Sequence, residues 1–183
     1  LTWVFFLLAQ RPEVVARIRA EVDAAVGDGP ITIEHAKRFP YIKAVFKETM
    51  RLYPPITFLP RVAAEETTLG GRRVRRGTMV LVAPWTIHRH RALWTDPELF
   101  DPDRFLDGRE ETIVPGAYVP FGLGPRVCVG AAFATLEAAL FIARLTRRFD
   151  FDAVEPATVR PVARLTTRPR REILMRVHAR GTR

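Results

Sequence analysis

The 183-residue sequence contains a single cysteine, Cys128, so an internal disulfide framework is excluded. It also lacks a long hydrophobic run: the longest apolar stretch, VFFLLA, is far too short to cross a bilayer. No segment has the pattern of a secretory signal, and there are no repeats. We therefore expect a cytoplasmic globular protein whose one thiol is a structural residue, a reactive group or a single metal ligand.

Positive charge is in excess, with a net charge of +9. Most of the excess lies after residue 143, where eleven arginines face four acidic residues. Basic chains often bind nucleic acid. Here the arginines are dispersed among prolines and strand-forming residues, without a recognition helix or an aromatic platform. We expect no nucleic-acid partner, and favour a surface for an acidic protein or a role in solubility.

Hydrophobic periodicity predicts mainly helices, with a small, segregated β part. The expected helices are residues 1–9, 12–26, 40–52 and a segment from Cys128 to about Phe149, whose apolar face carries Phe133, Leu136, Leu140 and Phe141. A hairpin around Gly70–Gly71, a strand at 78–83 and two short strands around a turn within 163–177 are expected, while 84–127 is mostly ordered loop. The first helix has no N-cap and no methionine before it, which indicates that an earlier part of the protein is missing.

The stretch FGLGPRVCVG places Cys128 among three glycines, directly before a predicted helix. Glycines let the backbone adopt positive φ and approach something flat or bulky. The start of a helix favours an anion, and therefore a thiolate. Arg126 offers a cation suited to a carboxylate. A thiolate ligand beside an arginine suggests haem, with iron on the sulfur and a propionate on the guanidinium. The alternative is a buried structural cysteine at a glycine-rich turn.

Five positions of this stretch, Phe121, Gly124, Arg126, Cys128 and Gly130, match the pattern F-x-x-G-x-R-x-C-x-G. This pattern resembles the haem-binding signature of the cytochrome P-450 superfamily. The resemblance implies that Cys128 is the axial iron ligand and that Phe121, Gly122, Gly124 and Gly130 surround it. The segments KETMRLYPP, FLPR and DPDRF follow the order expected for the same superfamily, so the resemblance covers essentially the whole chain.

Glu48 and Arg51 form an E-x-x-R pair, and residues three apart share one face of a helix. In the resembled family this pair is buried and completed by a downstream arginine, here Arg104. The resemblance therefore implies a structural triad of Glu48, Arg51 and Arg104. It also implies that Arg61, with Arg126, holds the haem propionates. His88 and Arg89 could approach the haem edge or lie exposed.

The resemblance implies that residues 1–183 are the C-terminal part of one cytochrome P-450 domain that binds haem b through a cysteine thiolate. The implied activity is monooxygenation of a small, apolar substrate with O2 and electrons from a ferredoxin, a flavodoxin or a reductase. The substrate-lining segments would be Ile56, Thr57 and Phe58, and Leu165 with Thr166. The helix after Cys128 carries three arginines that either form a docking site for the electron donor or lie on a solvated helix face: Arg144, Arg147 and Arg148.

The oxygen-activating motif of the resembled family would lie before Leu1. We therefore expect no catalytic residue within these 183 residues, and no activity from them alone. Two alternatives remain: a haem-thiolate peroxygenase or isomerase, and a non-catalytic haem-binding protein.

Overall fold

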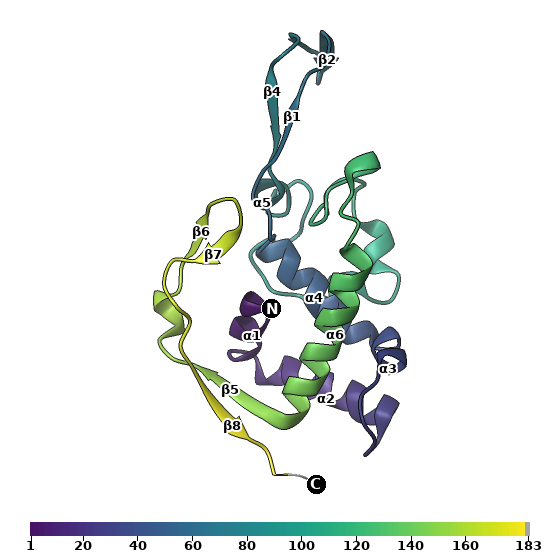
Figure 1. The fold of residues 1–183 in the computed structure, drawn as a ribbon, viewed down its shortest axis with the longest axis vertical. Helices are drawn as coiled ribbons and strands as arrows, with labels where there is room; N and C mark the ends of the chain where they lie inside the picture. The colour runs from purple at the N-terminus through teal and green to yellow at the C-terminus, as the bar shows by residue number, and fades with distance from the viewer. Residues whose placement is uncertain (182–183) are drawn as a thin grey trace.

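The computed structural model describes residues 1–181, and its framework is helical (Figure 1). The α-helices are α1 (Thr2–Leu8), α2 (Pro12–Val26), α3 (Ile33–Lys37), α4 (Pro40–Leu52), α5 (Pro84–Ile87) and α6 (Ala131–Arg148). Short 3₁₀ turns are η1 (Pro102–Phe105), η2 (Arg109–Thr112), η3 (Gly124–Arg126) and η4 (Pro156–Thr158). The predicted helices at 1–9, 12–26, 40–52 and after Cys128 are confirmed, and 84–127 is ordered loop with short turns as expected.

Helix α4 lies at the centre of the molecule, where it crosses α6 (Figure 1). Pro40 occupies its first turn, where a missing N–H costs nothing, and Pro54 follows directly after its end. Its N-terminus is capped from α2: the backbone N–H groups of Tyr41 and Ile42 donate to the Glu21 carboxylate at 2.6 and 3.0 Å. Most residues of α4 are buried. Polar side chains on this helix therefore end up in the protein interior.

The main core joins α1, α2, α4 and α6, and Ile18, Ile42 and Ile142 are fully buried within it. Helix α6 buries a face made of small and β-branched residues: Ala138, Ala139, Ile142, Ala143 and Thr146. Of the predicted apolar face, Leu136 and Leu140 are only partly buried against this core. Phe133 and Phe141 are 70% and 45% exposed, because the small side chains are the ones that let α6 approach α2 and α4 closely.

A second apolar cluster lies on the other side of α4. Ala44 packs there with Trp94, Phe105 and Ala117, which all come from the long loop between α5 and α6. The Phe105 and Tyr118 rings lie 4.9 Å apart. Burial of these rings keeps a segment with little regular structure fixed against α4.

The strands form four separate two-stranded antiparallel sheets within the described residues. They are β1 (Leu59–Val62) with β4 (Met79–Val82), β2 (Thr67–Leu69) with β3 (Arg72–Val74), β5 (Phe149–Ala153) with β8 (Met175–Ala179), and β6 (Pro161–Ala163) with β7 (Thr167–Pro169). The first two sheets make a ribbon that projects from the helical body (Figure 1). The hairpin at Gly70–Gly71 and the strand within 78–83 are confirmed.

The C-terminal strands depart from the predicted pairing. Two strands do form within and just beyond 163–177, but β7 pairs with β6 and β8 pairs with β5. Strand β5 follows α6 directly and lies against α1, where the Phe5 and Phe151 rings are 5.1 Å apart. The partner of β8 is thus set by the position of α6, a long-range relation that a local pattern does not contain.

Candidate functional site

Cys128 lies in a hydrogen-bonded loop that leads into α6. The Gly122 N–H donates to the Val119 carbonyl at 3.1 Å, and the Cys128 N–H donates to the Phe121 carbonyl at 2.9 Å. Gly122 and Gly124 have φ angles of +78° and +68°, a region that residues with a side chain rarely adopt. The two glycines and the two hydrogen bonds together fix the path of the backbone around the cysteine.

The Cys128 thiol is exposed at the N-terminal end of α6. The backbone carbonyl of Cys128 accepts a hydrogen bond from the Ala131 N–H at 3.2 Å, and Gly130 is the N-cap of the helix. A Cβ atom at Gly130 would come within 3.8 Å of the Cys128 sulfur. The sulfur therefore lies directly beside the start of α6.

The residues around the thiol are mostly apolar and exposed. Leu123, Val127 and Val129 in the loop, and Phe133 in the first turn of α6, are each more than half exposed. Exposed apolar side chains gathered in one segment indicate a surface that contacts another group. One thiol, apolar neighbours and the exposed cation of Arg126 together suit a flat apolar molecule that carries iron and carboxylates, so this donor set fits haem.

Strand β1 lies beside the cysteine loop. A Cβ atom at Gly122 would approach the Leu59 side chain to 3.8 Å. Arg61 lies two residues further along the strand, so its side chain leaves the same face as that of Leu59. Arg61 is exposed and donates to the Pro60 carbonyl at 2.8 Å. The structure thus brings Arg61 to the side of the loop that carries Gly122, although the two are 61 positions apart in the chain.

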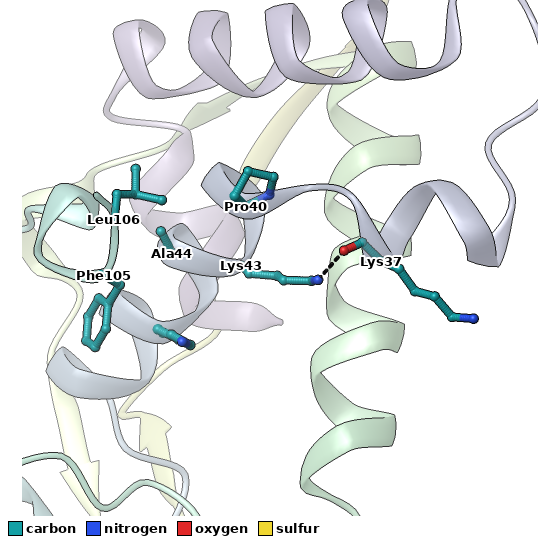
Figure 2. A pocket seen from close by; sticks show the side chains of 7 residues that line it. Lys37, Pro40, Lys43, Ala44, Phe105 and Leu106 are labelled. Atoms are coloured by element: carbon teal, nitrogen blue, oxygen red, sulfur yellow. Dashed lines mark hydrogen bonds between the residues drawn. The ribbon is translucent and has the colours of Figure 1, made fainter. Parts of the chain in front are cut away.

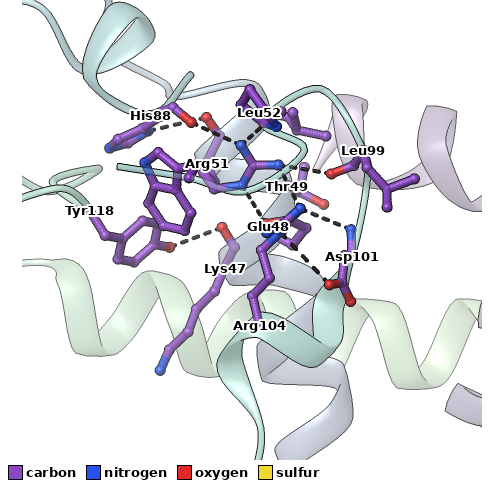
Figure 3. Close-up of polar contacts among 12 residues, drawn as sticks. Lys47, Glu48, Thr49, Arg51, Leu52, His88, Leu99, Asp101, Arg104 and Tyr118 are labelled. Carbon is purple, nitrogen blue, oxygen red and sulfur yellow. Dashed lines mark hydrogen bonds and ion pairs between the residues drawn. The ribbon is translucent and has the colours of Figure 1, made fainter. Parts of the chain in front are cut away.

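Glu48 and Arg51 form a fully buried ion pair on α4, with both side chains 0% exposed (Figure 3). The Arg51 guanidinium donates to both Glu48 carboxylate oxygens at 2.7 Å. It also donates to the His88, Pro97 and Leu99 carbonyls at 2.8, 2.6 and 2.9 Å. Burial raises the pKa of Glu48, while the hydrogen bond from Arg51 counteracts that shift. This arginine therefore joins α4 to the loop after α5.

Arg104 lies next to this pair, as Figure 3 shows, but its contact is looser. Its Nε atom is 3.5 Å from a Glu48 oxygen and makes no hydrogen bond. The terminal nitrogen of Arg104 instead donates to the Asp96 carbonyl at 2.9 Å. The Asp101 backbone N–H also donates to Glu48, at 2.9 Å. Glu48, Arg51 and Arg104 are thus brought together, with Arg51 as the close partner of the carboxylate.

The sequence analysis gave two alternatives for His88 and Arg89, a position at the haem edge or an exposed one. The structure shows that neither residue is exposed. His88 is fully buried, and burial lowers its pKa to about 4. Arg89 is partly buried, lies 3.6 Å over the Trp85 ring and donates to the Leu52 carbonyl. His88 lies between Ile87 and Arg89, and this short segment has no hydrophobic periodicity that would indicate burial, so the local sequence did not reveal either position.

The two segments predicted to line the substrate lie next to each other. Ile56 pairs with Thr166 in an isolated antiparallel bridge, and the Thr57 hydroxyl donates to the Arg164 carbonyl at 2.9 Å. Thr57 is buried, whereas Phe58 and Leu165 are exposed. The structure therefore joins these two regions of the chain, and it leaves two large apolar side chains of the set at the surface.

The basic residues at the end of α6 hold a loop. Arg144 donates to the Ile31 carbonyl at 2.8 Å, and Arg147 donates to the Gly27 and Gly29 carbonyls at 2.5 and 2.9 Å. These contacts fix the segment between α2 and α3 against α6. Neither of the two arginines thus belongs to a purely solvated helix face.

A second basic feature is a shallow pocket of about 220 Å³ beside α4 (Figure 2). Lys37, Lys43 and Lys47 line it together with Phe105 and other residues. Each lysine already has a partner. Lys37 pairs with Glu34 at 2.9 Å, Lys47 pairs with Glu110 at 2.6 Å, and Lys43 donates to the Lys37 carbonyl at 2.5 Å. The three cations therefore serve local contacts around α4.

A family model described as "Cytochrome P450" matches residues 1–175 of the chain. The chain belongs to the cytochrome P450 family. The heme domain of cytochrome P450DA, known from a crystal structure, superposes with a TM-score of 0.91 at 31% identity, over 99% of this chain and 40% of that one. The expected fold, mainly helical and corresponding to part of a P450 heme domain, is confirmed.

Several P450 relatives are similar in sequence. Cyclooctatin synthase of Streptomyces melanosporofaciens is 38% identical over 161 residues, which cover 88% of this chain and 35% of that protein. Protein LUTEIN DEFICIENT 5, chloroplastic, of Arabidopsis thaliana is 40% identical over 91% of this chain and 28% of its own length. Pentalenene oxygenase of Streptomyces avermitilis is 33% identical over 98% and 40%. The chain thus spans about a third of the length of these relatives.

Two further properties concern residues 1–181. None of their helices combines the length and the apolar character needed to cross a membrane. Within the same residues, no three or more histidine, cysteine or acidic side chains are grouped so that they could hold a metal ion.

Proposed function

We propose that the full-length protein is a haem-thiolate monooxygenase, and that this chain forms the C-terminal part of its single haem domain. The observation that carries the proposal is the exposed Cys128 thiol at the start of α6, in a loop that matches the P450 pattern. Several P450 relatives are named as oxygenases, among them pentalenene oxygenase and cyclooctat-9-en-7-ol 5-monooxygenase of Streptomyces. These relatives are about three times as long as this chain, and we expect residues 1–183 alone to be inactive.

In this proposal Cys128 holds the iron of haem b through its thiolate. When bound, haem supplies the one-electron and O2 chemistry that transfers one oxygen atom to an organic substrate. Gly122, Gly124 and Gly130 keep side chains away from the haem face, and Phe121 shields the sulfur from water.

The charged residues proposed for the haem are Arg126 and Arg61. Both residues are exposed; Arg126 lies within the loop of Cys128, and Arg61 lies on β1, which contacts that loop through Leu59. A guanidinium binds a carboxylate with two parallel hydrogen bonds, so each arginine suits one haem propionate. Their positions on η3 and β1 would fix the orientation of the macrocycle around the iron–sulfur bond.

The substrate is proposed to be a small apolar molecule that contacts two joined segments. These are Ile56, Thr57 and Phe58 before β1, and Leu165 with Thr166 before β7. The bridge between Ile56 and Thr166 supports this assignment, because it unites the two segments into one surface. Phe58 and Leu165 are exposed and offer apolar contacts.

Electrons are proposed to arrive from a ferredoxin, a flavodoxin or a reductase. The net charge of +9 supports an acidic donor. Among residues 1–181, Arg148 is the one of the three arginines at the end of α6 whose side chain makes no hydrogen bond or ion pair, so the proposed docking role of Arg144, Arg147 and Arg148 rests mainly on it. Charge reversal at Arg148 should slow reduction and leave haem content unchanged; an unchanged reduction rate would remove Arg148 from the docking surface.

The test is a substitution in the full-length protein. Cys128→Ser should abolish the strongly red-shifted Soret band of the reduced CO complex, which reports thiolate ligation. Val129→Ala, a change at the adjacent exposed residue, should preserve the band. With a donor and isotopically labelled O2, the unaltered protein should place one labelled oxygen atom in the product. A red-shifted band that survives in Cys128→Ser would overturn the assignment of the ligand.

A further inference from the structure

His88 lies between the buried ion pair of α4 and the loop that carries Cys128. It directly follows α5 and is fully buried. Figure 3 shows its ring beside Arg51 and close to Tyr118. The rings of His88 and Tyr118 are stacked with centroids 5.5 Å apart. The residue therefore belongs to the interior and has no access to a substrate or to solvent.

Both ring nitrogens of His88 are engaged with backbone groups. Nδ1 lies 3.1 Å from the Arg51 carbonyl, which only accepts, so Nδ1 carries the proton and donates. Nε2 accepts the N–H of Val119 at 2.9 Å. The ring is therefore neutral, with the proton on Nδ1. Burial and the nearby cations of Arg51 and Arg89 favour this neutral form, because each lowers the histidine pKa.

Arg51 also holds the backbone of His88. Its guanidinium donates to the His88 carbonyl at 2.8 Å, while the Arg51 carbonyl accepts from the His88 ring. The histidine is thus attached to α4 by two hydrogen bonds, one through its backbone and one through its ring. The Glu48 carboxylate fixes the guanidinium that makes the first of these bonds. The orientation of the ring is consequently set by α4.

On its other side His88 fixes the beginning of the cysteine loop. The Val119 N–H donates to the ring, and the Val119 carbonyl accepts from Gly122 at 3.1 Å. The Phe121 carbonyl, between them, accepts from the Cys128 N–H at 2.9 Å. A continuous series of hydrogen bonds therefore connects α4, through His88 and Val119, to the backbone N–H of the cysteine.

We propose that His88 is a positioning residue that transmits the fixed geometry of Glu48 and Arg51 to Cys128 through the N–H of Val119. This inference rests on the proposed haem-thiolate function. The ring has no free nitrogen, so it takes no part as an acid or a base. Its contribution is to hold the loop so that the sulfur stays at the helix start and keeps its bond to iron.

The two amide substitutions separate the two ring contacts. In His88→Asn the side-chain nitrogen takes the place of Nδ1 and keeps the bond to Arg51, but the side chain is too short to reach Val119. In His88→Gln the side-chain oxygen takes the place of Nε2 and still accepts the Val119 N–H. Each variant loses one buried hydrogen bond, so both should lower the urea midpoint of the full-length protein by a similar amount.

Only His88→Asn should change the cysteine loop. We expect hydrogen exchange at the Val119 amide to become about five- to tenfold faster, the factor that corresponds to one lost buried hydrogen bond. In the haem-loaded protein, the reduced CO complex should convert more quickly from the red-shifted to the blue-shifted Soret band. His88→Gln should behave like the unaltered protein in both measurements. Tyr118→Phe, which loses the hydroxyl bond to the Lys47 carbonyl, controls for general loosening and should leave the band stable.

Equal Soret behaviour of His88→Asn and His88→Gln would overturn the proposal, since the histidine would then act only on overall stability. If His88→Asn does not fold, His88→Gln decides alone, because loss of Val119 protection in that variant contradicts the proposed contact. Failure of the proposed function is recognised separately: the unaltered protein would then show no red-shifted band, whereas the exchange rate of Val119 would still report on His88.

Discussion

Replacing Arg51 by methionine should be among the most destabilising single changes in this protein. The side chain is fully buried and donates to both Glu48 oxygens and to three backbone carbonyls, of His88, Pro97 and Leu99. Methionine fills much of the same volume, so the experiment removes the charge and the five hydrogen bonds while it leaves only a small cavity.

The magnitude follows from what remains after the substitution. The Glu48 carboxylate keeps the Asp101 N–H at 2.9 Å and the guanidinium of Arg104 at 3.5 Å. Breaking a buried ion pair on one side costs about 3–5 kcal/mol, because a buried charge is left without compensation. Since burial already raises the pKa of Glu48, this carboxyl should become protonated in the variant, which limits the loss.

The free energy of unfolding would be measured by urea denaturation of the full-length protein, with Arg73→Met as the control. Arg73 pairs with Glu66 at 2.6 Å, but the two side chains are 69% and 54% exposed, so its loss should cost less than about 1 kcal/mol. The double variant Glu48→Gln/Arg51→Met should lose less than the sum of the single variants, by about 0.5–3 kcal/mol. Equal losses in Arg51→Met and Arg73→Met would refute the reasoning.

Three further predictions use the same denaturation assay. The pKa of His88 is lowered to about 4 in the folded state, so the unfolded chain takes up the proton first. The contribution of neutral His88 to the free energy of unfolding should be fully present above about pH 6.5. The free energy of unfolding should then fall by up to about 3 kcal/mol as the pH decreases toward 4, and it should fall less in His88→Gln. An identical pH profile in that variant would contradict this. Glu21→Ala should cost about 1–2 kcal/mol, because it removes the acceptor for two N–H groups at the start of α4, whereas Glu34→Ala at an exposed pair should cost almost nothing. Gly122→Ala should cost about 1–2 kcal/mol because φ is +78° there, and no change would indicate that the loop adapts.

Much of the helical framework could be predicted because its signals are local. Pro12 and Gly27 delimit one helix, and Pro40 and Pro54 delimit another. The face that α6 buries could not be predicted in the same way. Apolar side chains such as Phe133 are favoured for a core by hydrophobicity alone, yet α6 packs against its neighbours mainly through alanines, with Ile142 and Thr146.

The candidate site was predictable to the extent that it is a contiguous motif. Cys128, its glycines and Arg126 lie within ten residues, so their closeness in space follows from their order in the chain. The ion pair of Glu48 and Arg51 is also local, since residues three apart share a helix face. The complete burial of the pair could not be predicted locally, because the same pair would give the same local sequence pattern on a surface helix and on a central helix.

The sequence by itself determined the longer helices, the tight turns and the motif around Cys128, because each depends on neighbouring residues or on an uncommon residue type. The tertiary structure decided which groups meet. It placed Glu21 at the start of α4, paired β8 with β5, and set His88 between Arg51 and Val119. These contacts join residues far apart in the chain, and buried polar groups require such partners wherever packing brings them together.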